Sequence, residues 1–252
     1  MFTAIATDVG IKKKINQDSI VAYTGSFCGG PFGVAAVCDG MGGLAKGEVA
    51  SAMLVRAISG WVAESLPELL SLDKMNRAFE KTVDDMIREV DVQIKEYSAS
   101  LGHSCGTTIV LLLCYEGKFH AVNVGDSRIY RIRKNVLQIT KDQTFVQREI
   151  DRGHLTQEEA EHHPKRSVLL QCVGAGEFLN PEYIHGKYKE NDVFLVCCDG
   201  FRHEMTSDEF YSRFTGRNVV GRAAAEKALT EAIRTIKSRG EKDNISAVIL
   251  GV

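Results

Sequence analysis

Residues 34–51 read VAAVCDGMGGLAKGEVAS, an apolar run that ends at Asp39 and is followed by three glycines within four residues. The sequence then becomes helix-prone. Glycine costs conformational entropy on folding, so a glycine-rich segment is useful where the backbone must approach a ligand or point a carbonyl at an ion. The run therefore predicts a buried strand that carries Asp39 at its end. The glycines after it predict a site that binds a ligand or an ion.

Four further aspartates interrupt or end apolar runs, each beside glycine, asparagine or serine. They are Asp18, Asp126, Asp199 and Asp243. Taken singly, each is explained by ordinary turn hydrogen bonds. Together they form a set of strand-end carboxylates, and buried carboxylates need either backbone donors or metal ions as partners. Oxygen donors without His or Cys at ligand spacing favour Mg²⁺ or Mn²⁺ over zinc.

The rest of the pattern predicts sheets covered by helices. Amphipathic helices carry apolar stripes at about 49–61, 75–97 and 225–236. Strands are predicted at 3–8, 19–24, 32–38, 107–114, 118–124, 128–133, 136–139, 183–188, 192–198 and 244–251. The links between residues 107 and 139 are short and polar, which favours antiparallel hairpins over crossovers through a helix. Because strands and helices come in blocks, the predicted class is α+β.

The amino-acid composition argues against several classes of function and partner for this chain, beginning with nucleic-acid binding. The chain of 252 residues is 44% hydrophobic and 25% charged with a formal net charge of −2, so neither nucleic acid nor an anionic membrane is an expected partner. The start MFTAIATDVG does not resemble a signal peptide, and no apolar run reaches membrane length. The seven cysteines include no CxxC pair and are expected to be reduced, which favours a cytoplasmic location. No linker or repeat is present, so one domain is expected over 1–252.

Seven motifs occur in a characteristic order: TDVGIKKKINQDS (7–19), VCDGMGG (37–43), SCGTTIV (104–110), NVGDSRIYRI (123–132), a long segment from 140 to 174, LVCCDGF (195–201) and KDNISAVIL (242–250). Each is weak alone, but the ordered set resembles the PPM-type, or type 2C, metal-dependent protein Ser/Thr phosphatases in their bacterial single-domain form. The resemblance runs from about residue 3 to the end. It implies a four-layer α-β-β-α sandwich of two antiparallel sheets flanked by helix pairs.

The resemblance also implies a centre of two Mn²⁺ or Mg²⁺ ions. Asp39 would bridge both ions, and the Gly40 carbonyl would complete the second site. Asp199 and Asp243 would hold the first ion. Asp126 and Asp199 match the positions that bind a third ion in bacterial members. A hydroxide shared by two ions roughly 3.5–4 Å apart would attack the phosphorus of phosphoserine or phosphothreonine directly, so no Cys or Ser nucleophile is expected.

Further roles follow from the matched motifs. Asp18 would hydrogen-bond a metal-bound water, and Asn244 would orient Asp243. Arg128 is expected to form a structural ion pair, and Thr107 with its neighbour to make local hydrogen bonds.

A polar, helix-prone segment at about 142–166 matches the family's flap beside the active site. Gly153 interrupts its helical pattern, and Thr156 with Glu159 forms a capping-box pattern.

Three positions depart from the usual family pattern. Lys13 replaces the arginine that grips the substrate phosphate, keeping the charge but losing the bidentate fork. It is either a weaker phosphate-binding residue or part of a solvated run of lysines. Gln17 replaces a glutamate, which removes a negative charge near the metals. Met41 replaces a histidine proposed as general acid. His203 is a candidate substitute, but a surface histidine is the favoured reading.

Two rival functions remain open. A GDSL-like esterase would use Ser127 with Asp151 and His154, although the order and positions of these residues are unusual for that class. A pseudophosphatase would keep the fold and bind phosphoproteins or a kinase, and only Lys13 and Gln17 favour it. The resemblance otherwise implies phosphorylated proteins as substrates and a cognate Ser/Thr kinase as partner. The isolated domain favours a monomer.

Overall fold

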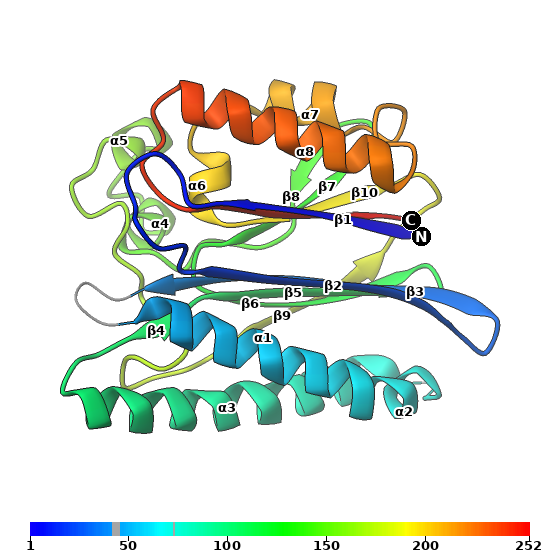
Figure 1. The fold of residues 1–252 in the computed structure, drawn as a ribbon, viewed down its shortest axis with the longest axis horizontal. Helices are drawn as coiled ribbons and strands as arrows, with labels where there is room; N and C mark the ends of the chain where they lie inside the picture. The colour runs from blue at the N-terminus through cyan, green and yellow to red at the C-terminus, as the bar shows by residue number, and fades with distance from the viewer. Residues whose placement is uncertain (42–45, 73) are drawn as a thin grey trace.

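Two antiparallel sheets pack face to face in the computed structural model, and helices cover the outer side of each (Figure 1). The structure describes residues 1–41, 46–72 and 74–252. The predicted four-layer α-β-β-α arrangement is confirmed. Among the described residues, none of the helices combines the length and the apolar character that are needed to cross a bilayer.

The first sheet brings the two ends of the chain together. Its strand order is β1 (Phe2–Asp8), β11 (Ile245–Gly251), β10 (Val193–Cys197), β7 (Arg128–Ile132) and β8 (Val136–Gln138). β1 pairs with β11 over its whole length, so the N- and C-terminal segments lie side by side in Figure 1. This pairing places the loop after β1 beside the loop before β11, and both loops contribute to the site.

The second sheet is built around a long hairpin. Its order is β2 (Asp18–Phe27), β3 (Gly30–Met41), β5 (Ile109–Tyr115), β6 (Lys118–Val124) and β9 (Glu182–Lys187), and β4 (Gly106–Thr107) pairs with the end of β3. Cys28 and Gly29 turn the hairpin with φ angles of 48° and 82°, the positive values that a two-residue turn between twisted strands requires. Cys28 is exposed, unlike the other six cysteines.

The buried strands alternate between two apolar cores. Ala35 and Val37 of β3 face the other sheet, whereas Val34, Ala36 and Cys38 face the helices. Successive side chains of a strand point to opposite faces, so a strand buried on both sides reads as a continuous apolar run. This explains why the run that ends at Asp39 shows no polar alternation.

Helices α1 (Gly47–Glu64), α2 (Leu66–Leu70) and α3 (Met75–Leu101) cover the second sheet, and α6 (Asp199–Arg202), α7 (Ser207–Phe214) and α8 (Gly221–Ser238) lie on the first (Figure 1). The short helices α6 and α7 were not predicted from the sequence. The signal for α7 was present, because Thr206 and Glu209 form a capping box at its start. α6 has only four residues, too few for a periodic pattern.

The segment 142–166, hereafter the flap segment, contains α4 (Phe145–Asp151) and α5 (Gln157–Glu161) at one end of the sandwich (Figure 1). The predicted capping box of Thr156 and Glu159 is confirmed. Gly153 has a φ of 73° between the two helices, which agrees with the predicted break.

Candidate active site

Asp18 and Asp39 lie directly opposite each other in β2 and β3. Together with Cys198 they offer three potential ligand atoms within 4.8 Å of one another. Both carboxylate oxygens of Asp18 are buried and have no hydrogen-bond partner among the described residues. Like charges in directly opposed positions destabilise a sheet, and a buried carboxylate without partners is costly. The two opposed carboxylates therefore need a positive charge to offset their repulsion.

The pKa values of the clustered carboxyl groups reflect the same deficit. Burial, together with Asp199 and Asp243, raises the pKa of Asp18 to about 6. Burial and the neighbouring acids raise the pKa of Asp39 well above its usual range. Burial and Asp199 raise the pKa of Asp126 to about 7. The other four aspartates singled out in the sequence are thus close enough to Asp39 to oppose its ionisation.

The backbone after Asp39 passes through a space that admits only glycine. The Gly40 N–H donates to the Gln17 carbonyl at 3.1 Å. A Cβ on Gly40 would lie 2.2 Å from the Gly47 carbonyl oxygen and 2.4 Å from that of Gln17. The Gln17 side chain donates to Glu48 in the first turn of α1 at 3.4 Å. The remaining glycines of the motif fall within 42–45, outside the described residues.

Two threonines hold the backbone of Asp39. The Asp39 N–H donates to Thr108 Oγ1 at 3.0 Å, and the Thr108 N–H donates to the Asp39 carbonyl at 2.9 Å. Thr107 Oγ1 donates to the same carbonyl at 3.1 Å. The predicted local hydrogen bonds of these threonines are confirmed, and they fix the direction in which the Asp39 side chain leaves the strand.

Lys13 contacts the cluster through Asp243. Its Nζ lies 2.8 Å from Asp243 Oδ1, and the same oxygen accepts the Asn244 N–H at 2.8 Å. Partial burial alone would lower the pKa of Lys13. The hydrogen bond to Asp243, with the nearby charges of Asp39 and Asp199, outweighs burial and raises it. Lys13 is therefore a charged neighbour of the acids and not merely part of a solvated run.

The side chain of Asn244 holds the loop that carries Lys13. Asn244 Nδ2 donates to the carbonyls of Val9 at 3.0 Å and Ile15 at 3.1 Å, and Asn244 Oδ1 accepts the Gln17 N–H at 2.9 Å. Asn244 is only 3% exposed. The sequence indicated a role beside Asp243, but it did not reveal this second role in the loop between β1 and β2.

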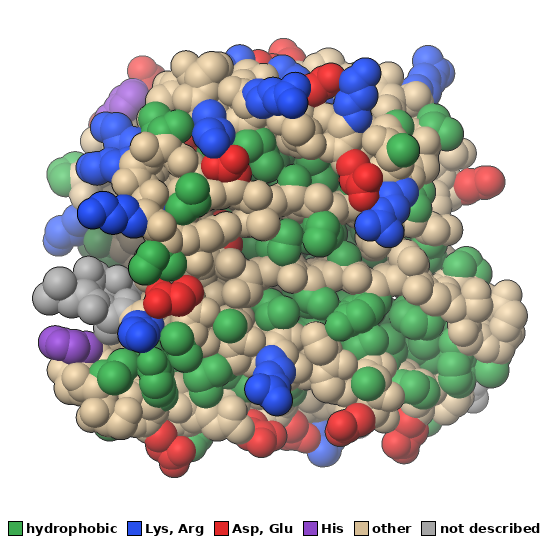
Figure 2. Space-filling model, in the orientation of Figure 1, with side chains coloured by type: hydrophobic (Ala, Val, Ile, Leu, Met, Phe, Trp, Pro, Cys, Tyr) green, Lys and Arg blue, Asp and Glu red, His purple; other side chains and the backbone are tan. Residues whose placement is uncertain are grey.

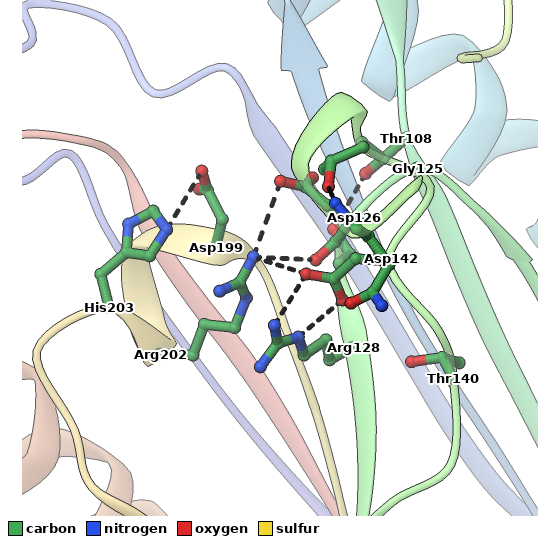
Figure 3. A network of polar contacts seen from close by, with 12 residues as sticks. Thr108, Gly125, Asp126, Arg128, Thr140, Asp142, Asp199, Arg202 and His203 are labelled. Carbon is green, nitrogen blue, oxygen red and sulfur yellow. Dashed lines mark hydrogen bonds and ion pairs between the residues drawn. The ribbon is translucent and has the colours of Figure 1, made fainter. Parts of the chain in front are cut away.

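His203 is exposed, as predicted, and it also lies beside the acidic cluster. Its Nε2 lies 3.9 Å from Asp199 Oδ2 (Figure 3), and its Nδ1 lies 3.5 Å from Glu241 Oε2. Its side chain is 28% exposed. The sequence did not reveal this proximity, because the unrecognised helix α6 turns the chain directly after Asp199 and brings a residue four positions later back over the carboxylate.

A second charged network lies behind Asp126, which is 6% exposed (Figure 3). Arg128 donates from Nε and Nη2 to the two oxygens of Asp142, each at 2.7 Å. The predicted structural ion pair of Arg128 is confirmed. Arg202 Nη2 lies 3.2 Å from Asp142 Oδ2 and 3.7 Å from Asp126 Oδ2. Neither Arg202 nor Asp142 was identified from the sequence as part of the site.

The residues of the esterase hypothesis are not brought together as a triad. Ser127 is fully buried. Asp151 pairs with Lys141 at 2.7 Å, and His154 pairs with Glu149 at 2.9 Å, both in or beside the flap segment. A buried serine without its histidine cannot attack a substrate from solvent, so the geometry does not support this hypothesis.

The acids open onto a cleft. Asp126, Asp199, Asp243 and Lys13 line a cavity of about 1260 Å³ whose other walls include both helices of the flap segment. Figure 2 shows Lys and Arg side chains gathered at the left edge of the molecule, at the end of the sandwich where the loop after β1 lies in Figure 1. Basic side chains at the edge of the cleft would attract an anionic ligand, and cations held by the carboxylates inside the cleft would bind it.

The donor set fits hard divalent cations. Its ligand atoms are carboxylate oxygens, they are crowded, and those of Asp18 have no other partner among the described residues. The Cys198 thiol is the one soft candidate in the Asp18–Asp39 group, but burial raises the pKa of this thiol well above its usual range. A protonated thiol is a poor ligand, so oxygen-preferring Mg²⁺ or Mn²⁺ suits the site better than zinc.

Known proteins with the same fold agree with this assignment. The family model described as protein phosphatase 2C matches residues 11–236. Serine/threonine protein phosphatase PstP of Mycobacterium tuberculosis is 30% identical over 99% of this chain, and the chain spans 44% of that protein's length. Serine/threonine phosphatase stp of Listeria monocytogenes is 30% identical over 85% of this chain and 82% of its own length.

Manganese ions are present in a solved structure of one of these relatives. The catalytic domain of PstP in complex with two manganese ions is 26% identical to this chain, with a TM-score of 0.77 over 98% of this chain and 96% of that one.

Proposed function

Because the chain belongs to the protein phosphatase 2C family, we propose that it is a metal-dependent protein phosphatase that hydrolyses phosphoserine and phosphothreonine. The observation that carries this proposal is the cluster of mutually opposed carboxylates, of which Asp126, Asp199 and Asp243 line an open cleft with Lys13. Such a cluster is unfavourable without cations, and its oxygen donors suit Mn²⁺ or Mg²⁺.

The residues of the cluster would have different roles. Asp39, Asp199 and Asp243 would hold the cations with the Gly40 carbonyl, and Asp18 would accept a hydrogen bond from a water in the cluster. When bound, two divalent cations lower the pKa of water toward neutrality and offset charge on the phosphoryl oxygens.

Lys13 would bind the substrate phosphate, because its ammonium group is held within 2.8 Å of Asp243 at the mouth of the cleft. Asn244 would position Lys13 by holding the loop that carries it.

The proposal extends to the surroundings of the site. Residues 1–252 would form one phosphatase domain, with the flap segment tuning which phosphoproteins enter the cleft. A cognate Ser/Thr kinase would supply the substrates, and the chain would act as a monomer. The seven free thiols support a reducing compartment such as the cytoplasm.

The test is hydrolysis of a phosphothreonine peptide as a function of Mn²⁺ concentration. We expect turnover that depends on Mn²⁺ and that Asp199→Ala abolishes, with Ser127→Ala as a folded control that retains it. Absence of turnover at every Mn²⁺ and Mg²⁺ concentration, in protein that is folded by circular dichroism, would overturn the proposal and favour the pseudophosphatase. Loss of turnover in Ser127→Ala alone would instead favour the esterase.

A further inference from the structure

Arg202 is a buried cation beside one of the predicted metal ligands. Its side chain is 13% exposed and projects from α6, one helical turn after Asp199. Nη2 reaches the Asp142 carboxylate at 3.2 Å, the Asp126 carboxylate at 3.7 Å and the Asp126 carbonyl at 3.5 Å (Figure 3). A single guanidinium nitrogen thus lies between two carboxylates and a backbone oxygen.

The charges of this network balance without a metal. Asp126 and Asp142 supply two negative charges, and Arg128 and Arg202 supply two positive charges. The opposite holds across the cluster, where no positive charge pairs with Asp18 among the described residues, and the nearby Ser246 and Cys198 side chains are too poorly placed to form regular hydrogen bonds with its oxygens. The need for an external cation is therefore uneven: it is strong at the Asp18 side and partly met at Asp126, whose pKa is still raised by burial and Asp199.

A divalent cation placed between Asp126 and Asp199 would have to share this space with Arg202. Two positive charges at contact distance repel each other, and the repulsion is stronger in a largely buried site than in bulk water. The guanidinium is not fully anchored, because its Nε is buried and has no hydrogen-bond partner among the described residues. Its position is therefore held chiefly by its contacts through Nη2, and the side chain has a reason to move if a competing cation neutralises the carboxylates.

We propose that Arg202 takes the place of a third divalent cation at Asp126. The inference rests on the proposed function in one respect, that divalent cations bind the acidic cluster. The chain then binds two such cations tightly, and a third enters only by displacing the Arg202 guanidinium from Asp126. Arg202 thereby sets the cation concentration at which the third site fills.

The experiment counts bound Mn²⁺ per chain by equilibrium dialysis and measures free Mn²⁺ by electron paramagnetic resonance. Five proteins are compared: wild type, Arg202→Gln, Arg202→Lys, Arg222→Gln and the double variant Arg202→Gln with Asp126→Asn. Arg202→Gln removes the charge, and Arg202→Lys keeps it. Arg222 forms an exposed helical pair with Glu226 and serves as the matched control for loss of one positive charge. Thermal melts of each variant establish that it is folded.

We expect wild type, Arg202→Lys and Arg222→Gln to bind two Mn²⁺ tightly and a third at least tenfold more weakly. Arg202→Gln should tighten the third site at least tenfold, and adding Asp126→Asn should abolish that gain. Three sites of equal affinity in wild type, or an unchanged third site in Arg202→Gln, would overturn the inference while leaving the proposed function intact. Absence of all Mn²⁺ binding in wild type would overturn both, which the phosphatase assay would show independently.

Discussion

Asp18 and Asp39 lie directly opposite each other in the β2–β3 ladder. No positively charged side chain among the described residues pairs with the oxygens of Asp18. Binding of a divalent cation here should therefore stabilise the native state. At a Mn²⁺ concentration one hundred times its dissociation constant, we expect the melting temperature to rise by about 5–10 °C. Differential scanning calorimetry with and without EDTA measures the shift. Asp39→Asn should remove it, and a wild-type protein that melts at the same temperature in both buffers would contradict the assignment.

Gly40→Ala should destabilise the fold by about 3 kcal/mol, because the new Cβ would lie 2.2 Å from the Gly47 carbonyl oxygen. Gly60→Ala is the matched control, since a Cβ on this glycine in α1 meets nothing within 4 Å. That variant should gain about 1 kcal/mol, because alanine is the better helix former. Urea denaturation measures both free energies of unfolding, and equal effects of the two substitutions would refute the close approach.

Lys13→Ala should raise KM for a phosphothreonine peptide about tenfold, a loss of about 1.4 kcal/mol in phosphate binding. Lys13→Arg should lower KM, because a guanidinium can bind two phosphate oxygens at once. Lys14→Ala is the control, as Lys14 is exposed and forms no ion pair with any described residue. Steady-state kinetics measure the three variants. If Lys13→Arg leaves both KM and kcat unchanged, Lys13 does not bind the phosphate.

Asn244→Ala should destabilise the loop between β1 and β2 and should have a smaller effect on kcat. It removes three hydrogen bonds to the residues around Lys13, which should cost about 2–4 kcal/mol of unfolding free energy. We expect faster amide hydrogen exchange at residues 9–17 and a higher KM. Asn218→Ala, at an exposed asparagine, provides the control. Unchanged exchange in this loop would show that Asn244 does not hold it.

The sheets and the acidic cluster could be predicted because both depend on local signals. Strand alternation and chain order place Asp39 and its partners at strand ends, and strand ends in a sandwich meet at a common edge. The strands of the hairpin were predicted too short, at 19–24 and 32–38, because glycine and polar residues lower strand propensity. The ladder bonds of a long hairpin nevertheless extend through such residues.

The contacts around the cluster could not be predicted, because they depend on packing between distant segments. Asn244 meets Val9 only because β1 and β11 pair. Arg202 and His203 reach the site through α6, whose four residues carry no measurable period. Residue type alone identifies the strand-end carboxylates, whereas the cations and hydrogen-bond donors around them become visible only in three dimensions.

A buried histidine, His120, gives the fold a pH dependence away from the cluster. His120 in β6 and His185 in β9 are directly opposed, with their Nδ1 atoms 3.0 Å apart, and His185 Nε2 lies 2.7 Å from Glu80. Burial, with His185 and Lys118, lowers the pKa of His120 to about 4. The native state therefore favours the neutral ring.

Because an unfolded histidine has a pKa of about 6.5, the unfolded chain binds more protons between that pH and pH 4. Stability should consequently fall as the pH is lowered through this window, by up to about 1.4 kcal/mol for each pH unit from His120. Urea denaturation at several pH values measures the slope, which His120→Gln should reduce by up to one proton. His103→Gln, at an exposed histidine that forms no ion pair with a described residue, is the matched control. Identical slopes for wild type and His120→Gln would show that His120 does not titrate as its burial requires.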